Sequence, residues 1–203
     1  MKKWLWMGLA AWMTVSAQAQ HAGLPIGSTA GVRHAGATSV SGGTLLSDDF
    51  NAHGGRLTFS PFGRFALFGD LAVLDPDHGD LGLAVQAGGL LTLPVSENLV
   101  DIGLRATWSH AGHDIKGGDV QRNAFALGLV FSREFKWLSP YCYAGGVVED
   151  KDVNTREGKR SKDRTYPSAA GGARLNLTRQ LALLGEVAHA RDWFASVGLN
   201  WTF

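Results

Sequence analysis

Cysteine is almost absent from this 203-residue sequence, in which Cys142 is the single cysteine. A single cysteine cannot form an internal disulfide, so no disulfide framework holds the fold together. Net charge is also nearly absent, because 19 Lys and Arg residues balance 18 Asp and Glu residues. A chain with a formal charge of +1 lacks the basic surplus typical of nucleic-acid-binding proteins, so we expect no nucleic acid as partner.

Long apolar runs are missing after the first residues of the chain. None approaches the roughly 20 residues that a membrane-spanning helix needs. The early apolar run, at 4–15, follows Lys2 and Lys3 and precedes the small-residue pattern Ala17-Gln18-Ala19. This order is typical of a cleavable secretory signal peptide. We therefore expect a signal peptide at 1–19, export across the inner membrane, and one domain at 20–203.

Proline is scarce and glycine is abundant, with 6 and 27 residues respectively. The glycines follow no tripeptide period, which excludes collagen, and the low proline content argues against a disordered linker. Glycine scattered through alternating segments suits a tightly curved sheet, where room for side chains is limited.

Apolar and polar residues alternate strictly in several segments of about ten residues. At 193–203 one face carries Trp193, Val197, Leu199, Trp201 and Phe203, and the other is largely polar. The segments 81–93, 100–108 and 123–135 alternate in the same way. A tilted strand of about this length crosses a bilayer, and a sheet enters hydrocarbon only when it is closed. The pattern therefore predicts an all-β, closed, antiparallel up-and-down transmembrane β-barrel.

The connectors between these segments alternate in length. Short ones fall at 61–63, 94–98, 136–139 and 178–180. Longer polar ones fall at 41–55, 75–80, 111–120 and 150–165, with a tight turn at 191–192. Barrels of this kind have short periplasmic turns and longer outer loops. We predict ten strands, the first two at 29–40 and 52–60, with both termini on the periplasmic side; eight strands is the alternative.

The two predicted faces differ in side-chain size, which separates a membrane barrel from a soluble one. The face assigned to the lumen is mostly Ala, Gly, Ser and Thr, which cannot form a dry core, so the Leu, Val, Phe and Trp face must meet lipid. Aromatic residues near strand ends are expected to form interfacial girdles. These residues are Trp108, Phe135, Trp137, Tyr141, Tyr143, Trp193, Trp201 and Phe203.

The final segment, Val197-Gly198-Leu199-Asn200-Trp201-Thr202-Phe203, ends on an aromatic residue. Together with the signal peptide and the hairpins, it resembles the small outer-membrane β-barrels of Gram-negative bacteria, the OmpA/OmpX-like superfamily. The resemblance covers nearly the whole mature chain as a pattern. It implies that Val197, Leu199, Trp201 and Phe203 form an assembly signal, read by the barrel-assembly machinery and periplasmic chaperones. Because nothing follows Phe203, we expect no periplasmic domain.

Several charged residues are predicted to face the lumen. They are Arg56, Asp70, Asp101, Arg105, Glu134, Arg174 and Glu186. Arg174 and Glu186 lie across the 178–180 turn, at or near facing positions. Two interpretations remain open: an ion-pair network that fills a narrow barrel, or the charged lining of a small aqueous pore.

The outer connectors carry the residues that are candidates for chemistry. Ser109, His110, His113 and Asp114 lie on one hairpin, and His189 and Asp192 lie on the last. Adjacent strand residues such as Ser109 and His110 face opposite sides, so they do not form a nucleophile–base pair. We therefore predict no catalytic, cofactor or metal site.

The basic residues at 150–165 are expected to meet lipopolysaccharide phosphates and outer-membrane lipid. The sequence favours an integral outer-membrane protein, either structural or a narrow porin-like channel, with outer loops available for ligand binding. The alternatives are an outer-membrane enzyme acting on lipid or peptide at the outer rim, and an adhesin-like surface barrel.

Overall fold

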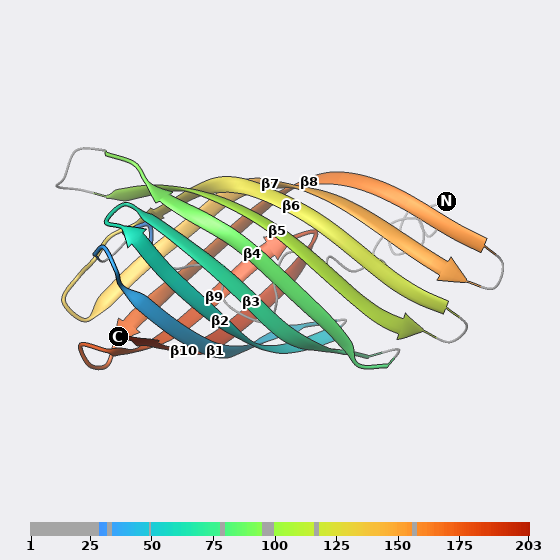
Figure 1. Cartoon of the computed structure of the whole chain (residues 1–203), viewed down its shortest axis with the longest axis horizontal. Coiled ribbons are helices and arrows are strands. Elements are labelled where there is room, and N and C mark those ends of the chain that lie inside the picture. Colours follow the sequence, from blue (N-terminus) through green and yellow to red (C-terminus); the bar gives the residue numbers. More distant parts are fainter. Residues whose placement is uncertain are drawn as a thin grey trace, which may run out of the picture.

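The computed structural model describes residues 29–31, 34–48, 50–77, 80–94, 100–115, 118–155 and 158–203. The predicted signal peptide lies outside these residues. The strands, in chain order, are β1 (Thr38–Ser47), β2 (Phe50–Phe62), β3 (Phe65–Pro76), β4 (Gly82–Thr92), β5 (Asp101–Ile115), β6 (Gly118–Ser132), β7 (Leu138–Thr155), β8 (Gly158–Asn176), β9 (Leu181–Ala190) and β10 (Asp192–Thr202). Figure 1 shows them side by side around one barrel.

The barrel closes between its first and last strands. β1 pairs antiparallel with β10, from Ser39 opposite Thr202 to Ser47 opposite Phe194. Every other strand pairs with its neighbours in the chain, so the topology is a closed up-and-down barrel. The predicted fold class is confirmed, with ten strands rather than eight. No helix among the described residues is long and apolar enough to cross a membrane.

The predicted position of the first strand is wrong, whereas the second, predicted at 52–60, lies within β2. β1 begins at Thr38 rather than near Thr29, and most of 41–55, predicted as a connector, belongs to β1 and β2. The paired residues here include Gly42 opposite Gly55 and Gly43 opposite Gly54. Glycine has no side chain to mark a face, so these strands show little alternation in the sequence.

The connectors predicted at 111–120 and 150–165 are also mostly strand. β5 pairs with β4 only as far as Gly112, and β8 pairs with β9 only from Ala169 onward. Beyond those points β5 to β8 continue as a four-stranded sheet that rises above the rest of the barrel. Figure 1 shows these strands reaching farther than their neighbours at one end. We call this extension the wall; it comprises residues 113–115, 118–122, 149–155 and 158–168.

The outer surface of the barrel is apolar around its circumference. Leucine and valine side chains on the outward positions are between 38% and 60% exposed, as at Leu57, Leu71, Leu83, Leu104, Leu129, Val187 and Val197. Exposed aromatic residues lie above and below them, with Phe62, Trp137 and Phe203 toward the C-terminal end and Trp108, Phe125 and Trp193 toward the wall. An apolar band between aromatic girdles is what a membrane-spanning barrel presents to lipid.

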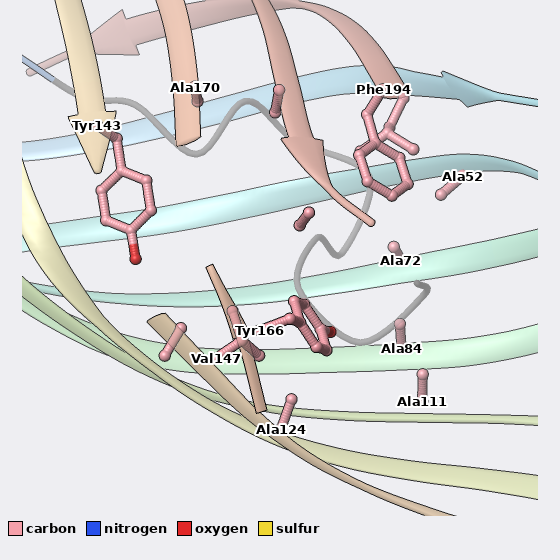
Figure 2. Packing of buried hydrophobic residues seen from close by; sticks show 14 of the residues in the cluster. Ala52, Ala72, Ala84, Ala111, Ala124, Tyr143, Val147, Tyr166, Ala170 and Phe194 are labelled. Carbon is pink, nitrogen blue, oxygen red and sulfur yellow. The ribbon is translucent and has the colours of Figure 1, made fainter. Parts of the chain in front are cut away.

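Tyr141 and Tyr143, predicted as girdle residues, face the interior instead. Their exposed fractions are only 5% and 2%. The register explains the difference, because Tyr141 lies opposite the inward-facing Ser132 of β6. In Figure 2, Tyr143, Tyr166 and Phe194 point into the lumen, alongside alanines from β2 to β6. Large side chains therefore fill space that the alanines leave open.

Tyr141 and Tyr143 each lie over a glycine of a neighbouring strand. A Cβ atom placed on Gly172 would be 2.5 Å from Tyr141 Oη and 2.6 Å from the Gly185 carbonyl oxygen. A Cβ atom on Gly128 would likewise be 2.5 Å from the Tyr143 ring. The lumen is therefore packed tightly enough to require glycine at positions 128 and 172 of the barrel.

We expect Gly172→Ala to lower the free energy of unfolding by about 1 to 3 kcal/mol, because the added methyl group collides with a ring and with backbone. Gly171→Ala is the matched control, since a Cβ there meets nothing within 4 Å. Urea unfolding of both variants in lipid vesicles measures the difference. Equal stabilities would contradict the packing described for Tyr141.

Candidate functional site

A bidentate ion pair lies inside the barrel between β2 and β3. Arg56 and Asp70 are opposite each other in the register. Arg56 Nε donates to Asp70 Oδ1 at 2.8 Å, and Arg56 Nη2 donates to Asp70 Oδ2 at 2.7 Å. The Asp70 side chain is fully buried and that of Arg56 is 9% exposed. Paired geometry of this kind is what allows two charges to remain buried.

Phe68 connects this pair to a second arginine. The Arg56 and Arg105 guanidinium carbons lie 4.7 Å and 4.9 Å from the centre of the Phe68 ring. An aromatic face attracts a cation, so the ring stabilises two arginines that would otherwise only repel each other. Arg56, Phe68 and Arg105 thus form a stack that begins on β2 and ends on β5.

The opposite side of the lumen contributes a carboxylate. Tyr141 Oη, on β7, donates to Glu186 Oε2, on β9, at 2.9 Å. Glu186 interacts electrostatically with both Arg56 and Arg105 across the lumen. We call these six residues the belt: Arg56, Phe68, Asp70, Arg105, Tyr141 and Glu186. Its two arginines and two carboxylates balance in charge, and every member is less than 10% exposed.

The remaining predicted lumen charges lie away from the belt. Asp101 and Glu134 are exposed at the C-terminal end of the barrel, close to Gly31. Arg174 Nε donates to Asn176 Oδ1 at 3.0 Å. The register places Arg174 opposite Leu184 and Glu186 opposite Gly172, so Arg174 and Glu186 are offset by two residues.

A second group of charges faces inward where the wall joins the barrel. Arg122 and Glu149 are 3% and 1% exposed. Tyr166 Oη donates to Glu149 Oε2 at 2.8 Å, and Arg122 interacts electrostatically with Glu149 and Arg164. Sequence alternation did not identify these residues, because the polar ends of the strands that carry them were interpreted as connectors. Counting the alternation of β6 back from Ala126 to Ala124 and Arg122 was the signal that places Arg122 inside.

Three basic residues on the inner face of the wall lie directly opposite one another. Arg122 of β6 faces Lys151 of β7, and Lys151 faces Lys162 of β8. We call these three residues the basic row. Arg160 and Arg164 share the same face of β8, and Glu149 is the one carboxylate on this face among the described wall residues. Like charges directly opposite each other on a sheet repel.

The outer face of the wall carries the opposite charge. Its acidic residues are Asp114, Asp119, Asp150, Asp152 and Asp163. Two of them accept hydrogen bonds on that face, Asp119 from Asn154 Nδ2 at 3.0 Å and Asp150 from Ser161 at 3.1 Å. Lys159 forms a 2.9 Å ion pair with Asp152, which lowers the pKa of Asp152. The wall is therefore basic inside and acidic outside.

The pKa of Lys151 reflects the electrostatics of the basic row. Lys151 lies beyond Val148, the last lipid-facing apolar residue of β7. Partial burial, followed by the charges of Arg122, Arg164 and Arg191, lowers the pKa of Lys151 from 10.5 to about 8, against the attraction of Glu149. Burial and the repulsion of the neighbouring arginines thus both disfavour the charged form of this lysine.

The candidate catalytic residues are not brought together. Ser109 is buried toward the lumen, whereas His110 faces outward, where its Nδ1 lies 2.9 Å from Asn123 Oδ1. His113 faces inward and Asp114 outward. His189 packs on Trp193 with the two ring centres 5.0 Å apart. Among the described residues no group of three or more side chains is placed to hold a metal ion.

The sequence matches no protein-family model and no curated protein. Solved structures of outer-membrane barrels are similar in fold. The outer-membrane protease OmpT of Escherichia coli matches with a TM-score of 0.51 at 8% identity, over 83% of this chain and 94% of that one. The N-terminal β-barrel domain of OprF from Pseudomonas aeruginosa has a TM-score of 0.44 at 10% identity, covering 83% and 98%.

The attachment invasion locus protein Ail of Yersinia pestis has a TM-score of 0.36 at 12% identity, covering 83% of this chain and 99% of that one. At these identities the similarity shows the fold alone. The chain has the fold of an outer-membrane β-barrel.

Proposed function

We propose that the protein is an integral outer-membrane barrel that does not conduct solutes and that binds a ligand at its outer mouth. The belt carries this proposal. Side chains that line a water-filled pore are wetted, whereas those of the belt are almost fully buried, with Arg105 only 2% exposed. The belt draws its residues from β2, β3, β5, β7 and β9, and Glu186 interacts electrostatically with both arginines, which supports a lumen closed across its width. A small barrel filled by its own side chains behaves in this way.

The orientation of the barrel supports a binding role for the wall. Phe203 lies at one end of the barrel, and the wall lies at the other (Figure 1). The β5–β6 and β7–β8 hairpins of the wall project beyond the apolar band. Because the longer segments between membrane-spanning strands lie outside the cell in outer-membrane barrels, we place the wall outside. Its acidic outer face is poorly suited to lipopolysaccharide phosphates, whereas its inner face is basic.

Single-channel recording of the refolded protein in a planar bilayer tests the closed lumen. We expect no stable conductance steps from the wild-type protein. Phe68→Ala removes the ring between Arg56 and Arg105 and is expected to open intermittent conductance. Phe125→Ala, which removes a ring from the lipid face, is the control. Discrete steps from the wild-type protein would refute the proposal in favour of a narrow channel.

We also propose that β10 serves as the assembly signal for the barrel-assembly machinery and periplasmic chaperones. Val197, Leu199, Trp201 and Phe203 lie on one outward face and are between 43% and 70% exposed. β10 is also the strand that closes the barrel against β1. A rim enzyme has less support, because Ser109 and His110 face opposite sides.

A further inference from the structure

We propose that the inner face of the wall is a binding site for a soluble polyanion that carries several phosphate or sulfate groups and approaches from outside the cell. The inference rests on the proposed function, in which the wall projects outward, and it names the class of ligand. The observation that carries it is the basic row, Arg122, Lys151 and Lys162, aligned across three adjacent strands.

The arrangement of the basic row suits an anion with more than one charged group. Neighbouring strands lie about 4.8 Å apart, so the three side chains are presented within roughly 10 Å. Arg160 and Arg164 lie on either side of Lys162 on the same face of β8. Guanidinium groups bind phosphate through paired hydrogen bonds, and lysines add point charges. Glu149 already accepts a hydrogen bond from Tyr166, and it is one carboxylate among several cations.

Arg191 adds an independent observation beside the wall, in the turn that follows β9, the strand next to β8. It forms the one-residue turn between β9 and β10 with φ at 83°, a left-handed conformation that favours glycine. Its Nη1 atom is buried and has no hydrogen-bond partner among the described residues. Its charge acts on both Arg122 and Lys151. A strained turn that keeps an arginine next to other cations is typical of a functional site.

The separation of charge between the two faces of the wall indicates the source of the ligand. Lipid headgroups around the barrel meet the outer face, where Asp150, Asp152 and Asp163 repel phosphate. The basic row faces the space above the lumen instead. The belt blocks passage below it, so the ligand is bound at the mouth and is not transported.

Isothermal titration of the full-length mature protein in phosphatidylcholine vesicles with tripolyphosphate tests the site. We expect a Lys151→Gln, Lys162→Gln double variant to weaken binding by about tenfold or more, since two charge-assisted contacts are lost. The control is Lys159→Gln, which removes a lysine from the outer face of the same hairpin and is expected to change affinity less than about twofold. Equal losses in both variants, or wild-type binding no tighter than that of orthophosphate, would overturn the proposal.

Two further measurements separate the alternatives. The double variant should unfold at the same or a higher urea concentration than the wild type, because opposed like charges are removed. Loss of binding accompanied by loss of folding would therefore count against the site. In vesicles that contain phosphatidylglycerol, the affinity for tripolyphosphate should change less than about twofold after correction for ionic strength. Strong competition by this lipid would mean that the basic row binds lipid headgroups, and would overturn the proposal that the ligand is soluble.

The conductance recordings described above distinguish this inference from the closed-lumen function. A barrel that conducts yet binds tripolyphosphate through Lys151 and Lys162 refutes the closed lumen and supports the site. A barrel that stays closed and does not bind refutes the site and leaves the closed lumen standing.

Discussion

Asp70→Asn is expected to lower the free energy of unfolding by about 3 to 5 kcal/mol, because it removes the charge that compensates a buried arginine. Arg56 would remain in the lumen beside the Phe68 ring, with Arg105 on the same ring. Glu186 would then be the one carboxylate of the belt facing two guanidinium groups. Urea titration in lipid vesicles, followed by tryptophan fluorescence, measures the loss.

A double variant separates the loss of the pair from the creation of an unpaired charge. Arg56→Met with Asp70→Leu removes one positive and one negative charge together, and leaves Arg105 with Glu186. Apolar replacement of a whole buried ion pair is often neutral, so we expect most of the stability to return. If Asp70→Asn alone costs less than about 1 kcal/mol, the buried pair described here is incorrect.

Leu129→Arg is expected to cost about 2 to 4 kcal/mol, because it places a charge near the middle of the lipid-facing band. Leu129 points outward on β6, between Phe125 and Phe135, and lies opposite Leu104 of β5. The variant keeps the strand intact and changes only what meets the acyl chains. Equilibrium folding into vesicles of defined thickness measures the cost.

Gln121→Arg is the control on the same strand and the same face, but outside the apolar band. Gln121 is exposed beyond Phe125, in the wall, so its replacement is expected to change stability by less than about 1 kcal/mol. A cost at Gln121 equal to that at Leu129 would mean that the apolar band does not mark the position of the bilayer.

The sequence predicted those parts of the fold in which side chains mark the two faces of a strand. The alternation at 123–135 and 193–203 identifies β6 and β10, and the number of hairpins gives ten strands. It failed at β1, whose Gly42 and Gly43 lie opposite Gly55 and Gly54 of β2. It also misassigned Tyr141 and Tyr143, because an aromatic residue near a strand end suits either a girdle or a narrow lumen, and only the register decides between them.

The candidate site was predicted in part. The inward parity of Arg56, Asp70, Arg105 and Glu186 follows from alternation, but their meeting around Phe68 depends on the register of strands far apart in the sequence. The basic row was missed because polar residues at 111–120 and 150–165 were interpreted as loops. A polar strand that has water on both sides has no apolar face, so composition alone does not distinguish it from a loop.

The wall has a consequence for how molecules of this protein behave next to one another. The membrane-spanning part of the barrel has no sheet edge. In the wall, however, residues 158–168 of β8 have no described neighbour on the β9 side. Such an edge is a template on which a strand from another molecule pairs and starts aggregation. Lys159, Arg160, Lys162 and Arg164 line that edge and repel the same segment of a second molecule. We therefore expect the charge that suits the mouth to an anion also to oppose pairing between the exposed β8 edges of two molecules.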